Sequence, residues 1–254
     1  MILLPAALFL SAVMAAAWWT QRRLRNAGWV AAFGTYGLGA AAVCLALTGG
    51  ARGYIVAGLM AAWALRLGGH IVGRSRRGPE DSRYAHFRVE WGAGFERRMF
   101  AFLQIQALAA LVLLVPVWLA ASAPGPLDWV DALGVAVALA AFVSEGVADR
   151  QLQAFRNDPR NHGRVCEAGL WSWSRHPNYF FEWLHWCAYP LLALSAGWWA
   201  VPALSGMALM YWLLVHVSGI PPLEAQMLRS RGDAYRNYQR RVRAFLPLPK
   251  GWTP

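Results

Sequence analysis

Long apolar runs separated by shorter polar stretches dominate the chain. A helix needs about 20 mostly apolar residues to cross a bilayer, and seven segments come close to that length. They are predicted at residues 2–19, 29–48, 53–72, 99–121, 130–148, 179–197 and 199–218. The fifth and sixth are the least uniform, because they carry Glu145, Glu182 and His185. The pattern predicts an all-α integral membrane protein, with one seven-helix domain over residues 1–254.

The basic residues lie almost entirely in alternate connections between these segments. Of the 24 Lys and Arg residues, 22 fall after the first, third, fifth and seventh segments. Arg52 lies in a connection on the other side, and Arg66 lies within the third segment. By the positive-inside rule the 22 are cytoplasmic, so we expect the N-terminus outside and the C-terminus inside. Signal peptides begin with basic residues, and no basic residue precedes the first apolar run. We therefore predict that this run is a retained membrane helix and not a signal peptide.

The amino-acid composition supports a membrane protein and indicates which molecules it contacts. Hydrophobic residues make up 57% of the chain and charged residues only 15%, which excludes disordered and ordinary soluble proteins. The net charge of +11 comes from the cytoplasmic basic residues, so it predicts contact with membrane lipids and requires no nucleic acid. Cys44, Cys166 and Cys187 are too widely spaced to indicate a disulfide framework or a zinc site. No metal is expected.

Ionisable residues inside the apolar segments form three pairs at helical spacing. Such residues are costly in a bilayer and often functional. Residues three or four apart share one helix face, and each pair lies toward the predicted cytoplasmic end of its segment. The pairs are Arg66 with His70, Glu145 with Asp149, and Glu182 with His185. We expect the three faces to converge on a water-accessible cavity. The alternative is that these residues pair with each other or reach the interface and serve only packing.

The connections at 73–98 and 149–178 and the tail at 219–254 hold most other polar residues, so chemistry with a polar cofactor is expected there. An interfacial helix is predicted around Tyr84–Phe95. Arginines can clamp phosphates and aromatic rings can stack on a purine or nicotinamide. Pro177 is suited to begin a helix, which places Asn178 in the first turn. The candidates of this kind are Arg156, Arg164, Trp171, Arg175, Tyr179 and Tyr235. A basic belt with an aromatic girdle is the alternative.

Two motifs make the chain similar to a known group. One runs Ser174-Arg175-His176-Pro177-Asn178-Tyr179 with Glu182, and the other Ser218-Gly219-Ile220-Pro221 with Glu224, followed by Arg231 to Tyr238 and Phe245-Leu246-Pro247. Together they resemble the bacterial membrane proteins related to steroid 5-alpha-reductases, the DUF1295 group. The resemblance implies seven transmembrane helices in a bacterial inner membrane. It also implies reduction, with NADPH, of a carbon–carbon double bond conjugated to a ketone in a steroid-like or other lipid.

The resemblance also assigns roles to residues. It implies that Glu145, Asp149, Arg156, Asn178 and Glu182 contact the cofactor, as does Glu224 after the last span. His176 belongs to the same motif and to the same predicted cofactor set. Arg66 corresponds to an arginine of the third span.

The chain departs from the group in its second span, where relatives carry a carboxylate and this chain has none. Tyr36 is the nearest candidate acid there. Tyr36, Arg66 and His70 are the candidates for the donor that polarises the substrate carbonyl, and the sequence does not choose among them. Two other readings remain open. Isoprenylcysteine carboxyl methyltransferases, which use S-adenosylmethionine, share the Arg-His-Pro and the later Glu. A non-enzymatic lipid-binding membrane protein would also lack the carboxylate. The oligomeric state is not indicated.

Overall fold

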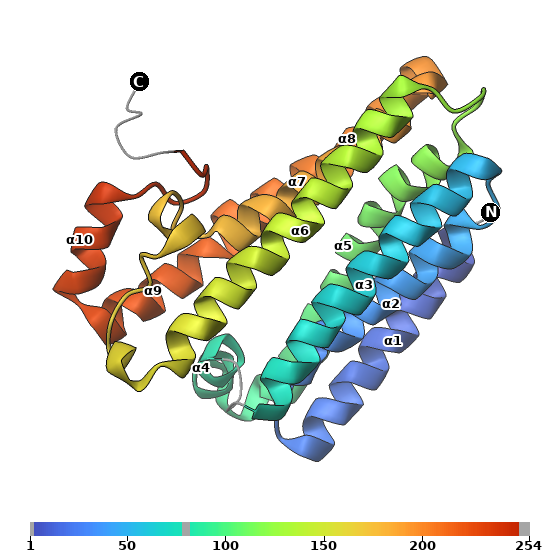
Figure 1. Cartoon of the computed structure of the whole chain (residues 1–254). Helices are drawn as coiled ribbons and strands as arrows, with labels where there is room; N and C mark the ends of the chain where they lie inside the picture. The colour runs from blue at the N-terminus through green and yellow to red at the C-terminus, as the bar shows by residue number, and fades with distance from the viewer. Residues whose placement is uncertain (1–2, 78–81, 249–254) are drawn as a thin grey trace. The chain divides into compact units, whose positions relative to one another are not determined.

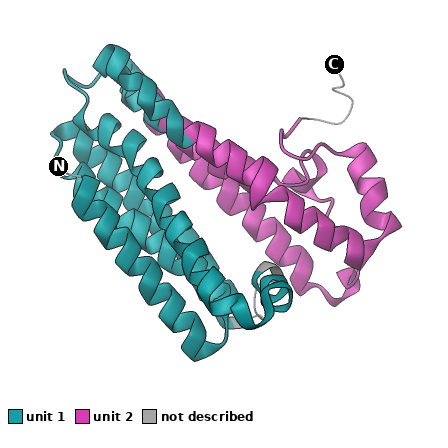
Figure 2. Ribbon diagram, turned by 180° about the vertical axis from the view of Figure 1, so that it is seen from behind, with its two compact units in different colours: residues 1–131, 189–206 teal, residues 132–188, 207–254 magenta. Residues whose placement is uncertain are grey.

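The computed structural model describes residues 3–77 and 82–248 (Figure 1). Residues 78–81 of the predicted 73–98 connection and residues 249–254 of the tail lie outside this range. Throughout the described residues the regular structure is helical and contains no strand. The chain divides into two compact units, each built from two separate stretches of sequence (Figure 2).

The first unit comprises residues 1–131 and 189–206. Within it α2 packs on α3, and α1 packs on both α2 and α5. Its elements are α1 (Leu3–Leu24), η1 (Ala27–Trp29), α2 (Val30–Ala46), α3 (Ala51–Arg77), α4 (Ser82–Trp91), η2 (Gly92–Gly94), α5 (Phe95–Ser122) and η5 (Leu194–Ala203). The α4 helix confirms that residues near Tyr84 are helical, as expected.

The second unit comprises residues 132–188 and 207–254. The division between the units cuts through α6, α7 and α8, so the units are not consecutive domains of the sequence. The elements from the start of α6 are α6 (Trp129–Asn157), η3 (Pro159–Asn161), η4 (Gly169–Ser172), α7 (Pro177–Leu192), α8 (Leu204–Trp212), the π-helix η6 (Leu213–Val217), α9 (Ile220–Arg231) and α10 (Asp233–Arg241).

Six helical stretches among the described residues are long and apolar enough to cross a membrane, which makes this a multi-pass membrane protein. Their bounds are Leu3–Leu24, Ala27–Ala46, Ala51–Arg76, Tyr84–Ser122, Trp129–Asn157 and Leu194–Arg231. The predicted segment 179–197 is not among them. Its helix, α7, has 16 residues and ends at Leu192, about 24 Å at 1.5 Å per residue. That length is shorter than a hydrocarbon core of about 30 Å.

Two predicted boundaries were wrong. The fifth segment was predicted to end at 148, but α6 continues to Asn157, so the first nine residues of the predicted 149–178 connection are helical. No glycine or proline interrupts those residues, and Pro159 marks the end two residues later. The last segment was predicted as one helix over 199–218. Its first residues belong instead to the 3-10 stretch η5, which ends at Ala203, and residues Leu213–Val217 form a π-helix before Ser218.

The predicted outer end of the first unit is closed by a buried ion pair. Arg52 begins α3 and is 4% exposed, and Asp131 in the first turn of α6 is 5% exposed. Arg52 Nε donates to Asp131 Oδ1 at 2.6 Å, and Nη2 donates to Oδ2 at 2.8 Å. The same guanidinium donates to the carbonyl oxygens of Ala123, Pro124 and Pro126. The one basic residue in the short connections therefore holds the 122–129 loop and is neutralised within the protein.

Candidate functional site

In the second unit a hydrogen bond joins two of the predicted cofactor residues. Asn178 Nδ2 donates to Asp149 Oδ1 at 3.4 Å, which links the first turn of α7 to α6. The α7 helix begins at Pro177, so the predicted helix start is confirmed. Glu145 lies one turn before Asp149 and is 4% exposed. The spacing of four residues places Glu145 and Asp149 on one face of α6, and Asn178 comes from the neighbouring helix.

One turn further along α7, the Glu182 carboxylate is buried. Trp186 Nε1 donates to Glu182 Oε1 at 3.0 Å within the helix. His185 is 2% exposed, and its ring meets the Trp186 ring edge-on at a centroid distance of 5.9 Å. On this part of α7 the Glu182 carboxylate therefore accepts a hydrogen bond from its own helix, whereas Asn178 bonds across to α6.

A second group of predicted residues forms an ionic network around the Glu224 carboxylate in α9. Arg175 Nε donates to Glu224 Oε1 at 2.7 Å, and His176 Nε2 lies 3.0 Å from the same oxygen. Gln239 in α10 donates through Nε2 to Glu224 Oε2 at 2.8 Å. Three donors on two oxygens suit an ionised carboxylate. The network ties the residues just before α7 to the C-terminal tail.

The tautomer of His176 follows from this geometry. Burial lowers the pKa of the His176 imidazole, while the Glu224 carboxylate opposes that effect and the Arg175 charge adds to it. The ring is therefore neutral at neutral pH, and its Nε2–H donates to Glu224. The other ring nitrogen, Nδ1, then carries a lone pair that is buried and accepts no hydrogen bond among the described residues. The Tyr179 ring stacks on the imidazole at a centroid distance of 5.6 Å and an angle of 10°.

The loop that contains η4 is held from both sides. The Tyr238 hydroxyl in α10 donates to the Trp171 carbonyl oxygen, and Ser174 Oγ donates to the Phe245 carbonyl oxygen at 2.9 Å. Trp171 Nε1 donates to the Ala148 carbonyl oxygen at 3.0 Å. The Trp171 ring is 7% exposed, so the structure places this predicted stacking residue in the packed interior between the loop and α6.

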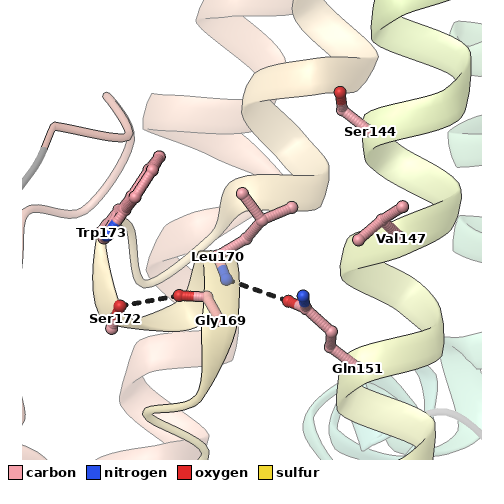
Figure 3. A pocket seen from close by; sticks show the side chains of 7 residues that line it. All are labelled: Ser144, Val147, Gln151, Gly169, Leu170, Ser172 and Trp173. Carbon is pink, nitrogen blue, oxygen red and sulfur yellow. Dashed lines mark hydrogen bonds between the residues drawn. The ribbon is translucent and has the colours of Figure 1, made fainter.

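A pocket of about 420 Å³ lies between α6 and the same loop, and Figure 3 shows the side chains that line it. It is lined by Ser144, Val147, Gln151, Gly169, Leu170, Ser172 and Trp173. Gln151 Oε1 accepts the Leu170 N–H at 2.9 Å. Gly169 has φ +59°, a left-handed conformation that favours glycine, and a Cβ atom there would lie 2.4 Å from Gln151 Nε2 and displace that side chain. At about 100° per residue, the three pocket residues of α6 face roughly opposite to Asp149.

The remaining predicted cofactor residues differ in exposure. Arg156, near the end of α6, and Arg164, in the loop before η4, are exposed. Arg156 follows Asp149 by seven residues, two helical turns, and so lies on the same face of α6. Tyr235 in α10 is 2% exposed, and burial raises the pKa of its hydroxyl with the Glu224 carboxylate acting in the same direction. Tyr235 therefore belongs to the surroundings of the Glu224 network.

The three candidate carbonyl donors belong to the first unit, and the structure does not gather them. Arg66 and His70 share one face of α3 at a spacing of four residues. Tyr36 of α2 packs on Gly68, where an added Cβ would lie 2.5 Å from the tyrosine ring. At about 100° per residue Gly68 lies on the opposite side of α3 from Arg66 and His70. Tyr36 is therefore an alternative to that pair and not its partner.

Three residues that were not predicted from the sequence contribute to the Glu224 network, to the η4 loop and to the pocket. Tyr238 joins the tail to the loop, Gln239 joins α10 to Glu224 of α9 within the tail, and Gln151 forms one side of the pocket. Tyr238 is the last residue of the Arg231 to Tyr238 motif, so the sequence did mark it as a candidate. Nothing in the pattern marks Gln239 or Gln151, because a glutamine in a polar helical turn usually faces solvent.

These features define a helical multi-pass membrane protein with a polar site at the α6–α7 helices. The chain belongs to the DUF1295 family, described as "Protein of unknown function (DUF1295)", which it matches over residues 17–242. It is also 29% identical over 228 residues to Uncharacterized protein C594.04c of Schizosaccharomyces pombe, across 78% of this chain and 64% of that protein. The chain thus spans less than two thirds of that relative's length. No solved structure matches it.

Proposed function

We propose that the protein is an NADPH-dependent membrane reductase that saturates a carbon–carbon double bond conjugated to a ketone in a steroid-like or other lipid. Membership of the DUF1295 family is compatible with a membrane enzyme of the steroid reductase type. The observation that carries the proposal is the Asp149–Asn178 hydrogen bond, with Glu145 and Glu182 one turn away on their respective helices. The two helices thus present carboxylates and a carboxamide from adjoining turns.

The chemistry of this donor set fits the cofactor. Asn178 offers both a donor and an acceptor, which suits the carboxamide of a nicotinamide or the edge of a purine. Arg156 and Arg164 are exposed guanidinium groups suited to pair with phosphates. Asp149 orients Asn178 through the bond between α6 and α7. Bound NADPH would supply a hydride; the residues of this chain would bind it, orient it and exclude water.

On the substrate side, one of the three candidate donors would polarise the ketone oxygen. Preorganised donors of this kind are typically worth about 3–4 kcal/mol of transition-state stabilisation each. Arg66 and His70 form one option and Tyr36 the other, because they lie on different sides of α3. An Arg66→Lys or His70→Gln change should lower kcat if the first option holds. A Tyr36→Phe change should lower it if the second does.

We infer seven crossings, with the N-terminus outside and the C-terminus cytoplasmic, in a cytoplasmic membrane such as the bacterial inner membrane. On this proposal α7 and the residues up to Gly197 would form the sixth crossing, and the rest of the stretch Leu194–Arg231 would form the seventh. A reporter fused at the C-terminus should be cytoplasmic, and one inserted in the 122–129 loop should lie on the opposite side. Both reporters on one side would contradict the seven-span topology.

The cofactor is tested by binding to the detergent-purified protein. Titration with NADPH, NADH and S-adenosylmethionine should show NADPH bound most tightly, because its 2′-phosphate adds charge for the arginines. We expect Asn178→Ala and Glu182→Gln each to weaken NADPH binding at least about tenfold, or roughly 1.4 kcal/mol. The matched control is Glu167→Gln, which removes only an exposed ion pair with Arg241.

Two outcomes would favour other functions. Binding of S-adenosylmethionine alone would support a methyltransferase related to the isoprenylcysteine enzymes. Binding of neither compound, with lipid retained through purification, would support a non-enzymatic lipid-binding protein. If Asn178→Ala and Glu182→Gln titrate NADPH like the wild type, the assignment of the α6–α7 residues to the cofactor is wrong.

A further inference from the structure

We propose that Arg175, His176 and Glu224 form a brace that positions Asn178, so that the C-terminal tail controls the cofactor site without touching the cofactor. This inference rests on the proposed function in one respect, because NADPH is the ligand that Asn178 is taken to bind. It reassigns three residues that the sequence analysis placed at the cofactor. The structural observations that support it all lie within the second unit.

The Arg175 side chain is already committed to the tail. Its Nε donates to Glu224, and its Nη1 donates to the carbonyl oxygens of Gln239 and Val242. Its main-chain N–H donates to the Arg243 carbonyl oxygen at 2.8 Å. The side chains of Arg175 and Glu224 are only 12% and 14% exposed. A phosphate would have to displace these internal acceptors to reach the Arg175 guanidinium, which is mostly buried, whereas Arg156 and Arg164 are exposed.

His176 connects the Arg175–Glu224 contacts to the start of α7. Its carbonyl oxygen accepts the N–H groups of Tyr179 at 3.1 Å and Phe180 at 3.2 Å, so it ends the loop and opens the helix. Its main-chain N–H donates to Ser174 Oγ, and that hydroxyl donates in turn to the Phe245 carbonyl oxygen. The ring itself is held by Glu224 and covered by Tyr179. His176 Nδ1 is sealed from solvent and so is out of reach of a ligand.

Asn178 lies two residues after His176, in the turn that this contact fixes. Its 3.4 Å bond to Asp149 is long for a hydrogen bond, so a small rotation of the first turn would break it. The Glu224 carboxylate opposes such a rotation because it holds His176 on one oxygen and Gln239 of the tail on the other. The tail therefore sets the direction in which Asn178 presents its carboxamide.

The first measurement needs no cofactor. Hydrogen exchange of the full-length protein in detergent should show faster exchange of the Tyr179 and Phe180 amides, and of residues 233–248, in Glu224→Ala. Glu224→Gln should give an intermediate result, because its amide oxygen still accepts from Arg175 and His176 but its amide nitrogen cannot accept from Gln239. Glu167→Gln should exchange like the wild type, since it breaks only an exposed contact between the loop and the tail.

The second measurement is a double-mutant cycle on NADPH affinity with Glu224→Ala and Asn178→Ala. A positioning residue acts through Asn178, so the two changes should be strongly non-additive. We expect Glu224→Ala alone to weaken binding about tenfold, and to add less than about twofold once Asn178 is already alanine. Additive losses would show that Glu224 touches the cofactor itself and would overturn the proposal.

The two measurements separate this proposal from the proposed function. Unchanged exchange at Tyr179 and Phe180 in Glu224→Ala would overturn the brace whether or not NADPH binds. Faster exchange in a wild-type protein that binds no NADPH would leave the brace in place and remove the proposed function. Faster exchange together with a non-additive cycle supports both. Should Glu224→Ala fail to fold, Glu224→Gln and Gln239→Ala provide the same two comparisons with a milder change.

Discussion

The buried pair of Arg52 and Asp131 allows a stability prediction whose size follows from the structure. Replacing Arg52 with Met removes both hydrogen bonds to Asp131 and those to the carbonyl oxygens of Ala123, Pro124 and Pro126. It leaves the Asp131 carboxylate, which is 5% exposed, without its cation. Removal of one partner of a buried pair typically costs about 3–5 kcal/mol. The carbonyl oxygens of Pro124 and Pro126 add little to this cost, because those residues are exposed and water can replace the guanidinium.

The expected loss therefore comes from an uncompensated charge and not from the number of contacts. Replacing Asp131 with Leu in the Arg52→Met background should recover most of the stability, to within about 1–2 kcal/mol of the wild type. The control pair is Arg22 and Glu96 in the same unit, which are 3.5 Å apart and substantially exposed. Arg22→Met should cost less than about 1 kcal/mol.

Unfolding by SDS in mixed micelles, followed by tryptophan fluorescence and circular dichroism, provides the comparison. The prediction orders the variants, with Arg52→Met least stable and the double variant and Arg22→Met close to the wild type. A double variant as unstable as Arg52→Met would refute the reasoning, because the carbonyl contacts of the 122–129 loop would then supply the stability. An Arg52→Met protein as stable as the wild type would show that Asp131 is not buried.

The other predictions concern the second unit. Burial lowers the pKa of His176 in the folded state, so the folded state should lose stability as pH falls below about 6.5. Thermal unfolding measured from about pH 7.5 to about pH 5 should show a smaller loss of stability in His176→Gln than in the wild type. Gly169→Ala should destabilise by about 1–2 kcal/mol from its left-handed backbone alone and displace Gln151, which unfolding midpoints would detect. Tyr238→Phe should cost about 1–3 kcal/mol by leaving the Trp171 carbonyl unpaired and should speed proteolysis of the tail; equal cleavage rates would contradict this.

Much of the helical layout could be predicted from the sequence, because apolar runs and proline mark it directly. Pro177 predicted the start of α7, since proline is favoured in a first helical turn. The extension of α6 to Asn157 was not predicted. The polar residues after 148 were taken to end the membrane segment, and the helix was assumed to end at the same place. The break near Gly197 coincides with the predicted boundary between segments 179–197 and 199–218. The 3-10 and π-helical geometry on the C-terminal side of that boundary was not predicted, because hydropathy does not distinguish one helix type from another.

The site was only partly predictable for a different reason. The resemblance assigned Asp149 and Asn178 to one cofactor without predicting a contact between them, and the structure joins the two residues by a hydrogen bond. The Glu224 network joins residues 48 and 49 positions apart through the folding of the tail. Periodicity describes neighbours on one helix, so it gives no information on such contacts. The motif residues Arg175, His176 and Glu224 were therefore recognised as a set, but their internal pairing required the structure.

The claim of NADPH-dependent reduction is tested most directly by following label from cofactor to product. The purified protein would be incubated with NADPH deuterated at C4 of the nicotinamide, in each of its two stereochemical forms, and a 3-oxo-4-ene steroid as the probe substrate. Reduction by this route adds one deuterium from the cofactor and one hydrogen from water, so mass spectrometry should show a saturated ketone that carries deuterium with one form of the cofactor. Asn178→Ala should reduce its yield at limiting NADPH. A wild-type protein that neither binds NADPH nor labels any product, but transfers a labelled methyl group from S-adenosylmethionine to a lipid, would contradict the account.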